Sequence, residues 1–379
     1  MSVRRERRAA LAGPTPGSSE APHCSIVVAA RNDDHGGDLL RRMQLFVSGL
    51  LEQCERYKLD AELVLVEWNP PEDRRRLAEE LRWPAESGRC KVRIIEVSPE
   101  IHRRFQHWQA LPLYQMIAKN VGIRRARGQF ILATNIDILF SNELIDFLAS
   151  GRLTGGRMYR VDRYDVPSDV PGESPLEARL AFCRENVIRI AACDGTSNVK
   201  TGQYHVVFPK HTWRMRLHQK LQDLCMVPVV HRSRLHTNAC GDFTLMAREH
   251  WFALQGYPEF DMFSLHLDSV LCYAAFHSGL REHVLRDPLR IYHIEHDTGS
   301  GWTPEGEARL NARLKSAAIP SLDDARFAEL AVRMRRDRKP LMSNRDDWGM
   351  ADLQLSESVV GMNTIKPRGT DTVAMINQA

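Results

Sequence analysis

The 379-residue sequence predicts an α/β protein in which a mostly parallel β-sheet is covered by helices on both faces. Three features of the sequence support this fold class. Short runs of continuous apolar and β-branched residues indicate strands that are buried on both faces. Between these runs lie segments in which apolar residues recur at helical spacing. The turns that join the two are short and polar, as in repeated β-α-β units with parallel strands.

The first half of the chain carries the clearest alternation, which begins at Cys24. Strands are expected at residues 24–30, 61–68, 91–97 and 129–140, with helices at 38–58, 72–82 and 112–127. Asp38 is expected to cap the first helix, because its side chain can accept from the free N–H groups of the first turn. Ligands of open α/β sheets bind outside the carboxyl ends of the strands. The places to inspect are therefore residues 31–37, 67–69 and 135–137.

The pattern is less regular after residue 150, and it gives no assignment for residues 193–237, which are rich in His and Arg. Strands are expected at residues 158–164 and 289–296, and helices at 176–192, 248–254, 267–278 and 304–338. The residues beyond about 355 have little periodicity, so we expect them to wrap around the body or fray.

The composition excludes several classes of protein. The chain is 43% hydrophobic and 26% charged, unlike a collagen, a disulfide-rich mini-protein or a disordered chain. No stretch approaches the ~20 unbroken apolar residues of a membrane helix. The eight cysteines form no C-x-x-C pair, which favours reduced, buried thiols over a zinc site. The net charge of +4 is too small to indicate a nucleic-acid partner.

Residues 1–23 are expected to form a disordered basic arm, because they are charged and lack the apolar core of a secretory signal. The cluster Arg4, Arg5, Arg7 and Arg8 either touches an anionic membrane surface or, as we favour, lies in a solvated tail. We therefore expect a cytoplasmic protein whose contact with the inner face of the membrane is peripheral at most.

Three common motifs of α/β proteins are absent from the sequence. The first strand–turn–helix lacks G-x-G-x-x-G, so a dinucleotide site is disfavoured. There is no G-x-x-x-x-G-K-[ST] and no G-x-S-x-G, which argues against a P-loop and an α/β-hydrolase. ARNDDHGG, at residues 30–37, also differs from the glycine-rich loop of nucleotidyltransferases. What remains is a parallel sheet whose strand ends carry acidic and amide groups.

The segment KNVGIRRARGQFILATNID, at residues 119–137, resembles N-x-G-x-x-x-A-x-G-x-(F/Y)-(I/L)-x-x-x-D-x-D of nucleotide-sugar-dependent glycosyltransferases of the GT-A fold, family 2-like. Other segments resemble further motifs of that family in the same order: CSIVVAARND (24–33), ELVLVEWNPPED (62–73), GDFTLMAR (241–248), GYPEF (256–260), HLDS (266–269) and Tyr292-His293. The resemblance covers about residues 24–300. It departs from the family at Asn135, where D-x-D has its first carboxylate, and at Leu267, where an E-D pair has its glutamate.

The resemblance implies a GT-A type sheet with a C-terminal helical extension. Residues 24–150 would form a nucleotide-sugar-binding half, residues 151–300 an acceptor-binding and catalytic half, and residues 301–379 the helical extension and tail. It also implies metal-assisted transfer of a sugar from a nucleoside-diphosphate sugar, with a UDP-sugar favoured, and with inversion. The acceptor would be a hydroxyl of a glycan, a lipid-linked or a small molecule. The expected cofactor is Mn²⁺ or Mg²⁺, and no nucleic acid is expected as a partner.

The resemblance further implies a set of site residues. The donor would be bound by Arg31, Asn32, Glu67, Asn120, Asn135 and Asp137. The metal ligands would be Asp137 and His293, with His296 as a near alternative. Asp268 would be the catalytic base, and the acceptor would contact Asp242, His266 and Trp302. Carboxylate and imidazole groups suit Mn²⁺-like ions, and a carboxylate can take the proton of an attacking hydroxyl.

Four of these residues also have a structural interpretation. Asp137 could cap a turn and Asp268 a helix, Glu67 could be a buried acid satisfied by a turn, and His293 could be an ordinary strand residue. The single carboxylates in the two variant motifs leave a catalytically inactive, GT-A-like sugar-binding or scaffold protein as the alternative function. A retaining transferase is a further alternative.

Overall fold

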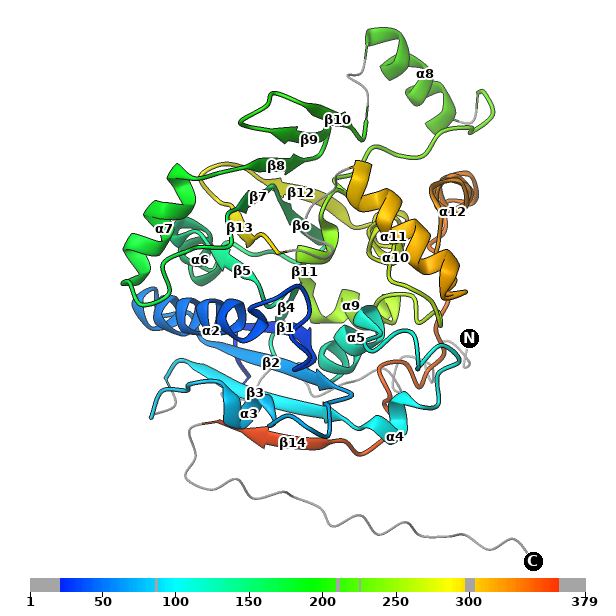
Figure 1. Cartoon of the computed structure of the whole chain (residues 1–379). Helices are drawn as coiled ribbons and strands as arrows, with labels where there is room; N and C mark the ends of the chain where they lie inside the picture. Colours follow the sequence, from blue (N-terminus) through cyan, green and yellow to red (C-terminus); the bar gives the residue numbers. More distant parts are fainter. Residues whose placement is uncertain (1–20, 86–87, 209–211, 225, 297–303, 361–379) are drawn as a thin grey trace, which may run out of the picture.

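The computed structural model describes residues 21–85, 88–208, 212–224, 226–296 and 304–360, and it is an α/β structure with two sheets (Figure 1). The larger sheet is mostly parallel and has helices on both faces, and further helices follow it toward the C-terminus. The fold class predicted from the sequence is therefore confirmed. Trp302 and nearly all of the expected basic arm lie outside the described residues.

The larger sheet has the strand order β12-β6-β11-β4-β1-β2-β3-β14. Its strands are β1 (Cys24–Ala30), β2 (Ala61–Trp68), β3 (Cys90–Val97), β4 (Phe130–Thr134), β6 (Arg157–Val161), β11 (Phe243–Ala247), β12 (Arg281–Leu285) and β14 (Ser356–Val359). β1 is parallel to β2 and β4, and β2 is parallel to β3, whereas β11 and β14 are antiparallel to their neighbours. The carboxyl ends of β1, β2 and β4 therefore meet at one edge of the sheet.

Every residue of β1 is buried, because helices cover the sheet on both sides. Ile26 and Val28 pack in the core on the side of α2 (Leu39–Arg56) and α6 (Asn142–Ala149). Val27 and Ala29 pack in the opposite core. That core contains residues of α5 (Gln115–Arg125), α9 (Arg248–Leu254) and α10 (Leu267–His277). Alternate side chains of a strand point to opposite faces, so a strand covered on both faces is apolar throughout.

Two glycines let α5 and the turn that follows it lie close against β1. A Cβ atom on Gly122 would be 2.5 Å from Cγ1 of Val27, and one on Gly128 would be 2.6 Å from the backbone nitrogen of Ser25. Heavy atoms do not approach so closely in a packed interior. These two glycines of the 119–137 segment therefore set the spacing between helix and strand.

The smaller sheet has the order β10-β9-β8-β7-β13-β5. Its strands are β5 (Ile138–Phe140), β7 (Arg163–Val166), β8 (Arg189–Ala192), β9 (Gly195–Asn198), β10 (Tyr204–Val206) and β13 (Ile291–Ile294). β13 is parallel to β7 and antiparallel to β5. Helix α7 (Leu176–Glu185) packs against this sheet through Leu176 and Leu180. Since β5 follows β4 after the short turn 135–137, the two sheets meet at the carboxyl end of β4.

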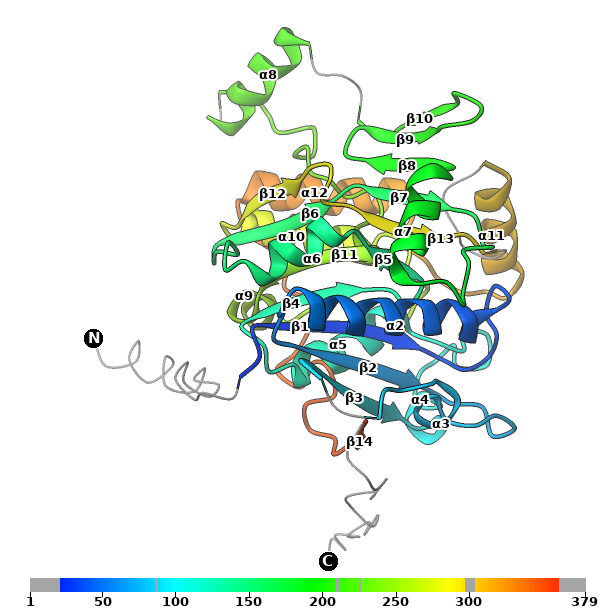
Figure 2. The ribbon, with the colours of Figure 1, turned by 90° about the vertical axis from the view of Figure 1, so that its left-hand side faces the viewer.

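The C-terminal extension contains α11 (Pro304–Ser316) and α12 (Asp324–Asp337). Helix α12 packs against α10 through Phe327 and Ala331, which share a core with Val270 and Tyr273. The two views in Figures 1 and 2 agree that α8 (Trp213–Asp223) stands out from the body at the end where β9 and β10 lie.

Two expected strands are each divided between the sheets. The strand expected at residues 129–140 is β4, which pairs with β1, and β5, which pairs with β13. The strand expected at 158–164 is likewise β6 in the larger sheet and β7 in the smaller one. In both cases the chain turns from one sheet into the other, because its two ends pair with strands from different parts of the sequence.

Four expectations about helices are wrong. The single helix expected at 304–338 is divided into α11 and α12, with residues 317–323 between them. The helix expected at 72–82 is only α3 (Leu77–Glu80), and the helix expected at 176–192 ends at Glu185, before β8 begins. Asp38 has a left-handed backbone with φ of 48°, and its side chain makes no capping hydrogen bond. The Oδ1 atom of Asp34 instead accepts from the backbone nitrogen of Leu39 at 3.1 Å. The backbone nitrogen of Gly37 donates to the carbonyl oxygen of Asp34 at 3.0 Å, and this turn brings the side chain of Asp34 to the start of α2.

The segment beyond residue 355 does not simply fray, because residues 356–359 form the edge strand β14. Glu357 on this strand pairs with Arg93 of β3 at 2.8 Å, and Arg93 also pairs with the buried Glu62 of β2 at 2.9 Å. A four-residue strand is too short to show a period-2 pattern, so the sequence carries no clear signal for it.

Candidate functional site

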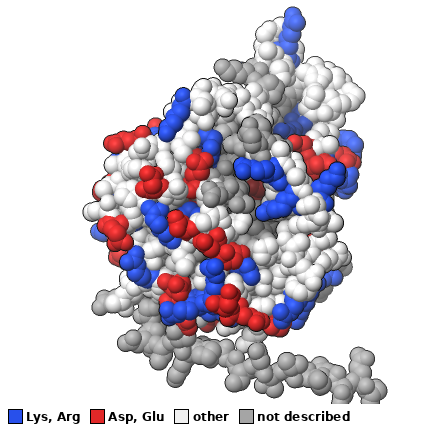
Figure 3. All heavy atoms as spheres, viewed as in Figure 1, with Lys and Arg blue, Asp and Glu red and all other residues white. Residues whose placement is uncertain are grey.

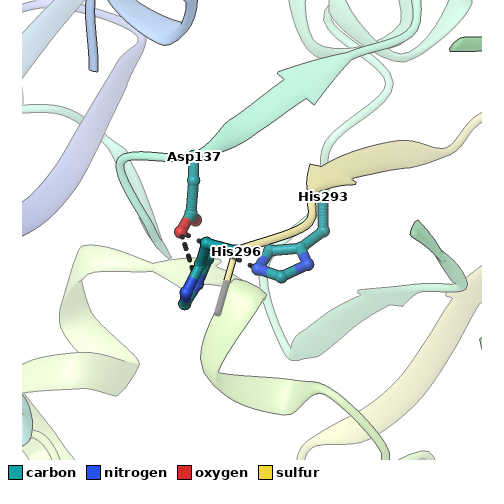
Figure 4. A group of neighbouring side chains, drawn as sticks. All are labelled: Asp137, His293 and His296. Atoms are coloured by element: carbon teal, nitrogen blue, oxygen red, sulfur yellow. Dashed lines mark ion pairs between the residues drawn. The ribbon is translucent and has the colours of Figure 1, made fainter. Parts of the chain in front are cut away.

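Asp137 lies in the turn between the carboxyl end of β4 and the start of β5. Its carbonyl oxygen accepts from the backbone nitrogen of Ile294 at 3.0 Å, which ties the turn to β13. Its carboxylate points at two histidines (Figure 4): Oδ2 is 3.7 Å from Nε2 of His293 and 3.3 Å from Nε2 of His296. We call Asp137, His293 and His296 the Asp-His-His group.

Each imidazole of this group is positioned by a neighbouring element. Nδ1 of His293 lies 3.3 Å from Oδ1 of Asp165, a fully buried residue of β7. His296 lies against the loop that follows β1, where a Cβ on Gly36 would be 2.5 Å from its Nδ1. Gly36 also has φ of +74°, a conformation that glycine adopts without strain. The loop after β1 therefore closes onto the group.

Burial and charge act in opposite directions on the group. Burial alone would raise the pKa of Asp137, but the charges of His293, His296 and Arg42 hold that pKa well below its usual range. Burial would lower the pKa of His293, but the carboxylates of Asp137 and Asp165 raise it. The surroundings thus favour the ionised form of the Asp137 carboxylate, because positive charge faces it. A bound cation would supply positive charge at the same place.

The Asp-His-His group could hold a metal ion. One ligand atom from each of its three residues lies within 4.8 Å of the others. Oδ1 of Asp137 and Nδ1 of His296 are buried and have no hydrogen-bond partner. Asp165, behind His293, is the kind of carboxylate that orients a metal-bound imidazole through its other ring nitrogen. The residues present therefore fit a metal ion of the kind that binds oxygen and imidazole ligands.

A chain of buried charges links this group to two other predicted residues. The amide of Asn135 donates to Oδ1 of Asp242, and Arg163 donates to Oδ2 of Asp242 at 2.6 Å. Arg163 also pairs with Asp165 at 2.8 Å, and Asp165 faces the Asp-His-His group. The structure thus brings together Asn135, Asp242 and the two predicted metal ligands.

Lys119 on α5 is a further buried cation of this region. Its Nζ donates to the carbonyl oxygen of Gly241 at 2.8 Å. Burial lowers its pKa to about 8, against the opposing effect of the carboxylates of Asp242, Asp268 and Asp137. The three carboxylates thus lie near enough to act on one ammonium group.

Asp268, the predicted base, lies in the first turn of α10 beside the same Gly241 turn. A Cβ on Gly241 would be 3.0 Å from Oδ2 of Asp268. The N-cap position of α10 is His266, and the carboxylate of Asp268 accepts from the backbone nitrogen of the next residue, Ser269, at 2.7 Å. Asp268 is half-buried, and because His266 holds the N-cap position, Asp268 does not occupy the capping position that was its structural alternative.

Arg31 and Asn32 lie at the carboxyl end of β1, where donor-binding residues were predicted. Arg31 donates to the carbonyl oxygen of Asn69 at 2.7 Å and pairs with Asp33 at 2.8 Å. Asn32 donates to the carbonyl oxygen of Arg75, and its own Oδ1 is buried without a hydrogen-bond partner. The end of β1 is thus fastened to the loop after β2.

Glu67 ends β2, but its carboxylate faces the next helix. Both of its oxygens lie 3.1 Å from the backbone nitrogen of Leu77, the first residue of α3. Burial raises the pKa of Glu67 to about 7. This arrangement matches the structural interpretation of Glu67 as an acid satisfied by a turn.

Asn120 and His266 are turned toward the scaffold. The amide of Asn120 donates to the carbonyl oxygen of Tyr257 and to Glu259, and its oxygen accepts from the backbone nitrogen of Tyr257. These three bonds hold the 256–260 turn. Both amide hydrogens of the Asn120 side chain are therefore already used in bonds within the protein. His266 lies 3.0 Å from Asp324 of α12 and stacks on Phe327.

The structure adds residues to the site that we did not predict from the sequence. Asp165 and Lys119 both contact or act on the predicted residues from buried positions. The only signal for Lys119 was its place beside Asn120 in the segment that resembles the glycosyltransferases. Asp165 had no signal, because its role depends on the pairing of β7 with β13.

Comparisons with known proteins give limited similarity. No protein-family model matches the chain, and no curated protein is detectably similar to it in sequence. Among solved structures, the chain is similar to that of S. aureus TarS, a glycosyltransferase, with a TM-score of 0.37 and 13% sequence identity. The match covers 80% of this chain but only 41% of the TarS chain. At this TM-score the similarity does not identify a function.

Within the described residues, no helix has the length and apolar character needed to cross a membrane. Acidic and basic side chains are interspersed over the face shown in Figure 3.

Proposed function

We propose that the protein is a glycosyltransferase that moves a sugar from a nucleoside-diphosphate sugar, with a UDP-sugar favoured, to a hydroxyl group. The acceptor would be a glycan, a lipid-linked or a small molecule, and the transfer would proceed with inversion. The observation that carries this proposal is the Asp-His-His group, which joins Asp137 after β4 to two histidines in and after β13. It lies where ligands of open α/β sheets bind, and a carboxylate there agrees with the D-x-D resemblance of Asn135-Ile136-Asp137.

The Asp-His-His group would hold the divalent cation. Two imidazoles among the three ligands favour Mn²⁺ over Mg²⁺, which prefers oxygen ligands and water. When bound, such an ion offsets the charge of the leaving diphosphate. Arg31 and the loop after β1, which touches His296 through Gly36, would face the nucleotide. Asn135 would orient the donor while it holds Asp242.

Asp268 would be the base of the reaction. Its carboxylate would accept the proton of the acceptor hydroxyl while that oxygen forms a bond to the anomeric carbon. The bond from the anomeric carbon to the diphosphate oxygen breaks at the same time, and the diphosphate leaves with the electron pair. Asp242 would contact the acceptor from the turn beside Asp268.

The division of the chain follows from these roles. Residues 24–150 would form the nucleotide-sugar-binding half. Residues 151–300 would form the acceptor-binding and catalytic half, which also supplies His293 and His296 to the metal site, and α12 of the extension packs against α10. The protein would act in the cytoplasm, where nucleotide sugars are made.

A second candidate function is sugar or nucleotide binding without transfer. It is favoured by Glu67 and Asn120, whose polar groups are engaged within the protein rather than left for a donor. The two functions differ in turnover but not in ligand binding.

The test has two stages. Thermal shifts are measured with UDP-, GDP-, CMP- and dTDP-sugars, with and without Mn²⁺, because a bound donor raises Tm by mass action. Nucleotide release is then measured for the wild type, Asp268→Asn and the control Asp146→Asn, whose carboxylate is exposed on α6. We expect Asp268→Asn to bind the donor normally and to lose at least about 100-fold in kcat. Unchanged turnover in Asp268→Asn contradicts the role of this residue, and donor binding without turnover in the wild type favours the second function.

A further inference from the structure

Exposed apolar side chains are concentrated in one part of the molecule. Of the thirteen large hydrophobic side chains that are exposed among the described residues, nine fall between residues 199 and 230. They are Val199, Tyr204, Val206, Trp213, Met215, Leu217, Leu224, Met226 and Val230. This segment includes the end of the smaller sheet, β10, and the helix α8, which stands away from the body (Figures 1 and 2). Large apolar side chains that are exposed together in this way indicate an interaction site.

Helix α8 turns its apolar side outward. Trp213, Leu217 and Leu224 lie at i, i+4 and i+11, which places them on one face of a helix. They are 69%, 50% and 69% exposed. The other side of the helix is held by Arg335 of α12, which donates to Gln222 at 3.0 Å and pairs with Asp223 at 2.7 Å. An amphipathic helix of a globular protein normally buries its apolar face against the core. The apolar side chains of α8 are exposed instead, so they are available to a partner.

The same segment is strongly basic. Residues 199–234 contain seven basic side chains and one acidic side chain, a net charge of +6, whereas the whole chain has a net charge of +4. The acidic side chain is Asp223, which Arg335 already neutralises. Arg214 and Arg216 are exposed on α8 on either side of these apolar residues, and the exposed Lys220, at i+7 from Trp213, lies among them. The partner of this surface is therefore expected to be negatively charged.

We propose that α8 docks on the surface of an anionic lipid bilayer. Trp213, Leu217 and Leu224 enter the boundary between headgroups and acyl chains. Arg214 and Arg216 on either side of them contact the headgroups, and Lys220 among them extends its ammonium group to the same level. A helix with an outward apolar face, a tryptophan and flanking basic residues has the character of an interfacial anchor. This surface is distinct from the N-terminal arginine cluster, and the proposal does not depend on the proposed transferase activity.

The test is flotation of the full-length protein with vesicles of phosphatidylcholine alone and of phosphatidylcholine mixed with phosphatidylglycerol. We expect binding only to the anionic vesicles, and loss of that binding in about 0.5 M NaCl, where charge interactions are screened. Leu217→Glu is expected to lower the vesicle-bound fraction at least about tenfold, because it places a charge in the apolar face. Met342→Glu is the matched control, since Met342 is 46% exposed and lies outside the segment.

Circular dichroism and Tm confirm that each variant is folded, and Leu224→Glu provides a second variant of the same face. Three outcomes would overturn the proposal. The wild type fails to bind anionic vesicles, or Leu217→Glu and Met342→Glu bind them equally well. In the third, sedimentation shows that the wild type self-associates through α8, with Leu217→Glu abolishing that association while vesicle binding persists. That last result would assign the surface to a second copy of the chain.

Discussion

Replacing Glu67 by glutamine is expected to change the pH dependence of stability in a defined direction. The side chain is 1% exposed and both of its oxygens face the backbone nitrogen of Leu77. Glutamine keeps the size of the side chain and an oxygen that can accept this bond, but it carries no charge. The substitution therefore isolates the effect of burying a carboxylate at the end of β2.

The size of the effect follows from the pKa. Burial raises the pKa of Glu67 from its ordinary value of 4.5 to about 7. The folded protein therefore binds this proton more tightly than the unfolded chain does, and stability decreases as the pH rises from about 4.5 to about 7. Each pKa unit corresponds to about 1.4 kcal/mol, so the carboxylate lowers the free energy of unfolding by about 3 kcal/mol above pH 7.

Urea unfolding of the wild type and Glu67→Gln at about pH 5 and about pH 8 measures this difference. We expect similar stabilities near pH 5 and a more stable variant near pH 8, by up to about 3 kcal/mol. Glu143→Gln, at an exposed position of α6, is the control and should behave like the wild type. A variant that is less stable than the wild type at the higher pH would refute the reasoning.

Two further predictions concern the scaffold of the site, and both are measured by urea unfolding. Gly122→Ala should lower the free energy of unfolding by about 1–3 kcal/mol, because the new Cβ meets Val27. Gly49→Ala is the comparison: its Cβ would have ordinary contacts of 3.5 Å, so it should raise the free energy of unfolding by up to about 1 kcal/mol. Equal effects of the two would contradict the close approach of α5 to β1. Asn120→Ala should cost roughly 2–4 kcal/mol by leaving buried groups of Tyr257 unpaired, and a loss below about 1 kcal/mol would show that the turn does not depend on this amide.

The parts of the fold that the sequence predicts well are those with local causes. The strands at residues 24–30 and 61–68 and the helix at 248–254 have the predicted bounds, because their apolar pattern alone decides them. The breaks at 135–137 and near residue 162 depend on pairing with β13 and β12, which no local pattern reveals. The short edge strand β14 depends on Glu357 reaching Arg93 across the whole chain.

The residues of the site also fall into those that the sequence suggests and those that only the assembled fold reveals. Asp137 and His293 could be proposed from the motifs and their order, and the structure places them near each other. The buried partners Asp165 and Lys119 could not, since a charged residue is recognised as buried only once the elements around it are assembled. Asn120 stands in the most informative motif, yet its hydrogen bonds hold a turn, so a motif residue can serve the scaffold rather than the chemistry.

Manganese binding measured by electron paramagnetic resonance tests the central claim, that Asp137, His293 and His296 form a metal site. We predict one tightly bound Mn²⁺ per chain in the wild type and in the control Asp146→Asn. Asp137→Asn and His296→Gln should each weaken binding at least about tenfold, because each removes a ligand. A wild type that binds no Mn²⁺, or variants that bind it as tightly as the wild type, would contradict the claim.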